Sequence, residues 1–286
     1  MHEQIKQRIE QVINNTASLP MIPEVASKIL NMVSNPDVSF KQVADEIVKD
    51  QAMTANILKL CNSAYFSKGK EITSIDRAMV TIGLKEVKDI VMVIATKPVL
   101  DRSVMGYDLA KGDLWKQGLV VANIAKKIAL LKKKKEVADV VFTGGIIHNV
   151  GKVVLAMHVQ GVFKEILETV KAKNITFNEA EKDVMGYDHQ EIGEKILANW
   201  KFPPVLRSIV RHYLEPDKAP VEHKMEVSIV HIANAVSLMA GIGIGSDGLY
   251  HEIHESAVKI SGITNEEITS LYEKVPEALN QIKDLL

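Results

Sequence analysis

The sequence has very little cysteine, few aromatic residues and no excess of either charge. Cys61 is the only cysteine among 286 residues, so no internal disulfide can form, which is typical of proteins in a reducing cytosol. Aromatic residues make up 5% of the chain, and 35 basic residues face 36 acidic ones. A chain balanced in this way has no global field to hold nucleic acid or an anionic membrane. We therefore expect neither as a partner.

Long apolar runs and a leader segment are also lacking. No uninterrupted apolar run approaches the length of a membrane span, and the N-terminus, M-H-E-Q-I-K-Q-R-I-E-Q, has no signal-peptide core. Hydrophobic residues (47%) and charged residues (25%) occur in the proportions of a globular protein with a substantial core. These features predict a globular protein of the cytoplasm.

The dominant pattern that is present is helical periodicity. Apolar residues recur three and four positions apart, and the first block of the chain contains no alternating run of strand length. Pro98 is expected to end this first block. The pattern predicts an all-α fold of roughly a dozen helices with short connections. Three capping boxes mark helix starts, at Ser39 with Gln42, Thr176 with Glu179, and Thr264 with Glu267.

One stretch, F-T-G-G-I-I-H-N-V-G-K at residues 142–152, interrupts an apolar run with two adjacent polar residues, His148 and Asn149. Three glycines surround the pair. Because a glycine inside a helix costs about 1 kcal/mol relative to alanine, their presence indicates close packing or a functional approach.

Other predicted helices each place a polar residue on or beside an apolar face. A single histidine of this kind is more often a hydrogen-bonded core residue than a ligand. Buried polar groups need partners, however, and the pattern recurs on five separate helices, so we expect these residues to converge. The predicted site consists of Gln117, His148, Asn149, His189, His212 and Asn234.

The order of these residues resembles the HD superfamily of metal-dependent phosphohydrolases, whose pattern is a His, a His-Asp pair and a late Asp. I-I-H-N-V-G-K resembles the L-x-H-D-I-G-K segment of that family, and H-I-A-N-A-V resembles its x-x-A-D-x-x motif. The first block narrows the resemblance to the HDOD (HD-related output) domain. The segments that carry it are L-P-M-I-P-E-V-A-S-K-I-L, K-D-Q-A-M-T-A-N-I-L-K-L-C-N-S-A-Y-F, I-T-S-I-D-R-A-M-V-T-I-G-L, W-K-Q-G-L-V-V-A, N-W-K-F-P-P and R-H-Y.

This resemblance covers about residues 19–240 and implies an all-helical fold with a signal-output role in bacteria. The domain organisation that we expect is an N-terminal helix, an HDOD domain and a C-terminal helical extension that completes the HD-like bundle. The corresponding ranges are 1–18 for the helix, 19–214 for the domain (19–98 as an N-terminal helical subdomain, with the bundle at 113–240 overlapping the C-terminal part) and 215–286 for the extension.

The chain departs from the HD pattern at three positions. Gln117 stands where an active member has its first His, and Asn149 and Asn234 stand where it has its two Asp residues. Amide oxygens carry no formal charge, so a two-metal hydrolytic site cannot be assembled as in the active members. We therefore assign no catalytic residue and expect no cofactor. The alternative is one divalent transition metal held by three imidazoles with a water, since zinc accepts such a set; the ligands would be His148, His189 and His212.

Two further patterns have structural rather than functional interpretations. The helix pair at residues 39–61 could suggest a helix-turn-helix, but its second helix offers Gln51, Asn56 and Lys59 with no arginine towards DNA. The glycine-rich segment Gly241 to Gly248 follows a helix rather than a strand, so we interpret it as a flexible hairpin and not as a dinucleotide loop.

The sequence thus predicts a non-catalytic regulatory module of the HDOD type that acts through contacts with other signalling proteins. By the resemblance, these partners are sensor kinases, response regulators or nucleotide-messenger enzymes. The alternative is a degenerate HD-type phosphohydrolase that keeps a single metal or a nucleotide ligand, and a DNA-binding helix-turn-helix protein is the third possibility. The oligomeric state stays open.

Overall fold

The computed structural model describes residues 2–14, 22–33, 37–67, 69, 71–158, 160–247 and 252–285. By its internal contacts the chain divides into two compact units. Unit 1 comprises Met1–Met21 and Val99–Val275, and unit 2 comprises Ile22–Pro98 and Pro276–Leu286. The described residues contain no β-strand, and an isolated bridge pairs Val104 with Leu109. The all-α class predicted from the sequence is confirmed.

Unit 2 is a group of short helices in which α3 packs against α2 and α5, and α4 packs against α5. Ser39 and Gln42 form the predicted capping box at the start of α3. Cys61 is buried at the end of α4, and burial raises the pKa of its thiol to about 11. The helices are α2 (Glu24–Val33), α3 (Phe40–Ile47), α4 (Gln51–Cys61), α5 (Ile75–Thr81), most of α6 (Leu84–Leu100) and most of α17 (Val275–Ile282).

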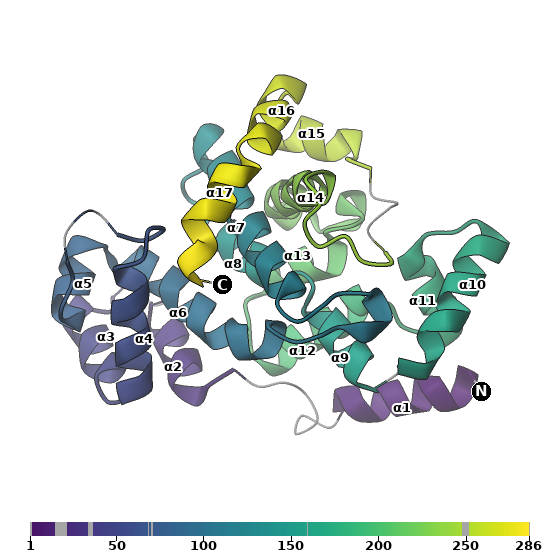
Figure 1. Ribbon diagram of the computed structural model, residues 1–286, viewed down its shortest axis with the longest axis horizontal. Helices are drawn as coiled ribbons and strands as arrows, with labels where there is room; N and C mark the ends of the chain where they lie inside the picture. The colour runs from purple at the N-terminus through teal and green to yellow at the C-terminus, as the bar shows by residue number, and fades with distance from the viewer. Residues whose placement is uncertain are drawn as a thin grey trace. The chain divides into compact units, whose positions relative to one another are not determined.

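Unit 1 is built around three buried helices, α7, α8 and α14, which pack against one another at its centre (Figure 1). α12 packs against both α9 and α13, and α1 lies along α9, α11 and α12. The α-helices of this unit are α1 (His2–Asn14), α7 (Asp113–Leu131), α8 (Ala138–Ile147), α9 (Val150–His158), α10 (Phe163–Lys173), α11 (Phe177–Met185), α12 (His189–Asn199), α13 (Pro204–His212), α14 (Lys224–Met239), α15 (Glu255–Ser261) and α16 (Asn265–Glu273).

Local sequence signals set several of the helix starts. Capping boxes open α11 at Thr176 and α16 at Thr264, as predicted, and Asp188 opens α12 with a further box that includes Glu191. Pro98 does not end α6, which continues through the proline to Leu100. By contacts, the first stretch of unit 2 ends at Pro98.

The central stretch of the sequence is not one continuous helix. α8 ends at Ile147 and α9 begins at Val150, so His148 and Asn149 form the turn between them. The whole segment Ala138–His158 is long and apolar enough to cross a membrane by length and composition alone. Its most apolar window is 89% buried inside the protein, however, which is typical of a core element of a helical bundle.

Residues 276–286 group with unit 2 by contacts. The predicted boundaries at residues 18, 98, 113, 214 and 240 remain predictions.

Candidate functional site

Three carboxamide side chains meet at the centre of unit 1. Gln117 comes from α7, Asn234 from α14 and Asn149 from the turn between α8 and α9. The Asn149 amide donates a hydrogen bond of 3.0 Å to Oε1 of Gln117, and the Gln117 amide donates one of 3.2 Å to Oδ1 of Asn234. All three residues are buried. The predicted convergence of these three positions is therefore observed, and we call them the amide cluster.

Glycines allow the helices to approach closely enough for this contact. A Cβ atom added to Gly145 of α8 would lie 2.6 Å from the backbone of Ala122 on α7. A Cβ added to Gly151 of α9 would lie 1.8 Å from the backbone oxygen of His189 on α12. Both distances are far below van der Waals contact, so the close packing predicted from the glycines is confirmed.

His189 extends the network away from the amide cluster. Its backbone N–H donates a hydrogen bond of 3.0 Å to Oε2 of Glu181, and its ring atom Nδ1 lies 2.7 Å from the same oxygen. The Tyr107 hydroxyl donates a hydrogen bond to the other oxygen of Glu181. On the opposite side of the ring, Nε2 of His189 lies 2.7 Å from the hydroxyl of Tyr213. Both ring nitrogens of His189 are thus hydrogen-bonded.

Tyr213 joins the two halves of the network. Its hydroxyl donates a hydrogen bond of 2.7 Å to Oδ1 of Asn149 while contacting His189 on the other side. Burial and the neighbouring carboxylates raise the pKa of this hydroxyl well above its usual value, so it stays protonated and able to donate. A continuous chain of hydrogen bonds then crosses unit 1: Tyr107, Glu181, His189, Tyr213, Asn149, Gln117 and Asn234.

His212 does not join this chain. The face of α13 that turns inward carries Ile209, Val210 and Tyr213, whereas His212 is half-buried and lines a surface hollow beside Arg211. Burial and the Arg211 charge lower the pKa of His212. The sequence analysis placed His212 on an apolar face with Val205. In the structure the buried face is shifted by one residue, so Leu206 and Tyr213 are buried in place of Val205 and His212.

His148 lies in the core beside Tyr213, with ring centroids 4.9 Å apart in an edge-on arrangement. Its Nδ1 atom lies 2.7 Å from the backbone oxygen of Gly145, which can only accept, so Nδ1 carries the proton. Burial lowers the pKa of the ring to about 3, and the nearby Lys152 charge adds to this. Nε2 is therefore an unprotonated acceptor in the core, and a hydrogen-bonding interaction with the Asn234 side chain opposes part of the lowering of the ring pKa.

A buried ion pair lies next to the network. Nζ of Lys152 is 2.6 Å from Oδ2 of Asp247, and both side chains are only 3% exposed. Asp247 belongs to the glycine-rich segment that follows α14, which we expected to be a flexible hairpin. Over residues 241–247 that expectation is corrected, because Ile242, Gly245 and Asp247 are buried against unit 1.

These donors do not fit a metal ion of the HD type. The amide cluster supplies no carboxylate, both nitrogens of His189 are committed to Glu181 and Tyr213, and His212 is elsewhere. Among the described residues, no group of three or more His, Cys, Asp and Glu side chains is arranged to hold a metal. His148 Nε2 remains as a single lone pair, which is too few ligands for a protein metal centre.

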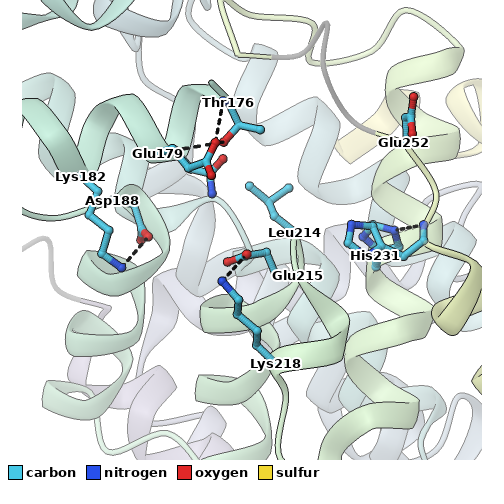
Figure 2. Close-up of a pocket in the computed structure, with 11 residues that line it drawn as sticks. Thr176, Glu179, Lys182, Asp188, Leu214, Glu215, Lys218, His231 and Glu252 are labelled. Atoms are coloured by element: carbon cyan, nitrogen blue, oxygen red, sulfur yellow. Dashed lines mark hydrogen bonds and ion pairs between the residues drawn. The ribbon is translucent and has the colours of Figure 1, made fainter. Parts of the chain in front are cut away.

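A polar pocket of about 250 Å³ opens near this network (Figure 2). Its inner wall includes His231, whose Nδ1 atom lies 2.8 Å from the backbone oxygen of Tyr213. Two ion pairs lie in its wall, Lys182 with Asp188 at 3.7 Å and Lys218 with Glu215 at 2.5 Å (Figure 2). Because Glu179 and Glu252 also line the pocket, its carboxylates outnumber its lysines and it carries an excess of negative charge.

Sequence reasoning missed three members of the network, although one left a signal. Glu181 lies on the same helix face as Phe177, Ala180 and Val184, all of which are buried. A carboxylate at that spacing marks a buried acid and could have been recognised. Tyr107 comes from an irregular segment without periodicity, so no comparable signal exists for it.

Curated relatives of the chain are longer proteins without an assigned function. An uncharacterized protein of Treponema pallidum is 28% identical over 217 residues, which cover 74% of this chain and 41% of the relative. YuxH, an uncharacterized protein of Bacillus subtilis, is 26% identical over 117 residues, 41% of this chain and 28% of that protein. The matched residues thus span less than half the length of either relative.

Solved structures share the fold at low sequence identity. An HDOD domain protein of unknown function from Geobacter sulfurreducens has a TM-score of 0.80 at 22% identity, with 99% of both chains covered. A provisionally named phosphohydrolase from Shewanella amazonensis has a TM-score of 0.73 at 24% identity, covering 98% of this chain and 99% of that one. A provisionally named signal-transduction protein from Marinobacter aquaeolei has a TM-score of 0.73 at 18% identity, covering 99% and 64%.

The model of the HDOD domain matches residues 19–216, more than half of the chain. This agrees with the all-helical fold and with the HD-like order of the residues in the central network. The chain belongs to the HDOD family, the HD-related output domains.

Proposed function

We propose that this protein is a non-catalytic regulatory module that transmits a signal through contacts with other signalling proteins. The observation that carries the proposal is the amide cluster. An HD hydrolase has metal ligands at the positions of Gln117, Asn149 and Asn234. Here these three side chains are hydrogen-bonded to one another. A satisfied polar network of this kind makes the core rigid and specific.

The chemistry of the rest of the network supports the same proposal. Hydrolysis of a phosphoester in an HD site needs a metal that lowers the pKa of a bound water. Here the acid beside His189 is Glu181, and its two oxygens are engaged by His189 and Tyr107. No group in the network is left to bind a metal and activate water at the same time.

The proposed partners are sensor kinases, response regulators or enzymes of nucleotide messengers. Support comes from family membership and from the fold shared with a protein named for signal transduction. We propose no nucleic-acid partner, because α4 contains one lysine and no arginine with which to contact phosphates and base edges. We likewise propose no membrane partner and a cytoplasmic location.

Two assays on the full chain test the proposal. The first measures hydrolysis of a chromogenic phosphodiester and of cyclic dinucleotides in the presence of Mn²⁺, Mg²⁺ or Zn²⁺, and we expect no turnover above the metal alone. The second is a two-hybrid screen against the sensor kinases, response regulators and nucleotide-messenger enzymes of the source organism, and we expect at least one specific partner. Metal-dependent turnover together with an empty screen would favour the alternative, a degenerate hydrolase with one metal or a nucleotide ligand.

A further inference from the structure

The segment that follows α14 begins with a rigid connection. Gly241 has a φ of +79°, and the helix end is closed by hydrogen bonds from Gly241 N–H to Leu238 and from Ile242 N–H to Ser237, at 2.9 and 3.0 Å. This is a Schellman arrangement, which fixes the direction in which the chain leaves the helix. It aims residues 243–247 back over the amide cluster.

Two glycines of this segment touch the network directly. A Cβ atom added to Gly243 would lie 2.2 Å from Cδ of Gln117, so the backbone of the segment covers the carboxamide of that residue. A Cβ added to Gly245 would lie 2.3 Å from the backbone oxygen of Tyr107. The neighbouring Ser246 N–H donates a hydrogen bond of 2.8 Å to that same Tyr107 oxygen. Only a chain without side chains at these two positions can close so tightly.

Polar contacts join this closed arrangement to the rest of unit 1. They include the Ser246 hydrogen bond and the ion pair of Asp247 with Lys152, and no other carboxylate pairs with Lys152 among the described residues. On the outer side, Ile244 is 44% exposed. A buried ion pair gives little net stability, because the cost of removing both charges from water offsets their attraction. Any state in which one of the charges stays buried without its partner is strongly destabilised, however. Short connecting segments can open locally without unfolding of the whole domain.

We propose that residues 241–247 form a plug over the amide cluster and that the Lys152–Asp247 ion pair is its latch. The closed state seals Gln117 from solvent. In the open state, Asp247 leaves with the plug, Lys152 is hydrated, and the amide cluster becomes accessible. The plug does not depend on the proposed regulatory role, because it requires only that the segment opens and closes.

Hydrogen exchange of the Ser246 amide on the full chain reports opening of the plug. Gly243→Ala places a methyl group against Gln117, and Gly241→Ala is its matched control. Both glycines have a positive φ, +74° and +79°, but a Cβ at Gly241 meets nothing within 4 Å. Both substitutions carry the strain of a positive φ, but only Gly243→Ala also adds an overlap with Gln117, so we expect it to speed exchange at Ser246 at least about tenfold more than Gly241→Ala does. Equal effects of the two substitutions would overturn the plug.

The latch is tested with Asp247→Asn and Lys152→Met, each of which strands one buried charge. We expect each to speed exchange at Ser246 by at least about tenfold while the amides of α7 and α14 keep their protection. The control is Asp183→Asn, which breaks the exposed pair of Asp183 with Lys173 and should leave Ser246 unchanged. Unchanged exchange at Ser246 in both latch variants would overturn the assignment. If a latch variant does not fold, the Gly243 and Gly241 pair decides alone.

Discussion

The hydroxyl of Tyr213 lies 2.7 Å from Nε2 of His189. That contact occupies one of the two nitrogens with which His189 could bind a metal, and Glu181 occupies the other at 2.7 Å. The site of this protein is thus closed by its own side chains on both sides of a histidine that the sequence pattern marks as a ligand.

Replacing Tyr213 by Phe should destabilise the protein by about 2–3 kcal/mol, because His189 Nε2 and Asn149 Oδ1 both lose a buried partner. The measurement is the free energy of unfolding in urea. The adjacent His212→Ala is the control and should cost under about 1 kcal/mol, because His212 is only half-buried and outside the network. A larger loss for His212→Ala than for Tyr213→Phe would contradict the assignment of Tyr213 to the site.

Asn149→Asp restores the acid of the HD pattern and should cost about 2–4 kcal/mol of unfolding free energy. The new carboxylate would be buried and would face the Oε1 atom of Gln117, which accepts rather than donates. The same chemical change at the exposed Asn265, the first residue of α16, should be neutral or slightly stabilising, because an acid suits a helix N-terminus. Equal effects at the two positions would argue against a buried amide cluster.

A methyl group at Gly151 should be poorly tolerated. Its Cβ would lie 1.8 Å from the backbone oxygen of His189, so α9 and α12 would have to move apart, at a cost of about 3 kcal/mol or more. Gly161→Ala is the matched control, since nothing lies within 4 Å of its Cβ. Thermal unfolding of both variants checks this, and similar melting temperatures would mean that the helices are less tightly packed than described.

His148 should make stability depend on pH in a defined window. Its pKa is about 3 in the folded protein and about 6.5 when unfolded, so between these values the unfolded chain binds the extra proton. Stability then falls as the pH drops from about 6.5 towards 3, by up to about 4–5 kcal/mol, and is unaffected above that window. His148→Gln should remove this pH dependence of the unfolding free energy. Above the window, the unfolding free energies of the two proteins should differ by a constant. Parallel curves for the two proteins would contradict a neutral, buried His148.

The sequence was sufficient for the fold class and for the core positions on α7, α12, α14 and the turn between α8 and α9, but not for Tyr107, Glu181 and Tyr213. Capping boxes at Ser39, Thr176 and Thr264 act within four residues, so they can be recognised locally, and the three amides stand at motif positions of a known pattern. The choice on α13 failed because His212 and Tyr213 are adjacent. One residue turns a helix by about 100°, so a single-position error in the stripe exchanges a buried residue for a half-exposed one.

Long-range pairing could not be predicted in the same way. Lys152 and Asp247 lie 95 positions apart in the sequence, and no local pattern around either residue indicates the other as its partner. Residues 241–247 turn inward because Gly243 packs against the side chain of Gln117. The position of Gln117 is set by the packing of the helices and not by the local sequence of the segment. Contacts of this type are decided by tertiary structure rather than by pattern.

The metal content of the untagged full chain tests the central claim most directly. It should be measured by elemental analysis after purification in the presence of Mn²⁺ and Zn²⁺, alongside the variant with Gln117→His, Asn149→Asp and Asn234→Asp. We predict that the wild-type protein carries no stoichiometric transition metal, whereas the variant gains metal because its carboxylates and imidazole restore the HD ligand set. One tightly held metal per wild-type chain, lost on substitution of His148 or His189, would contradict the account.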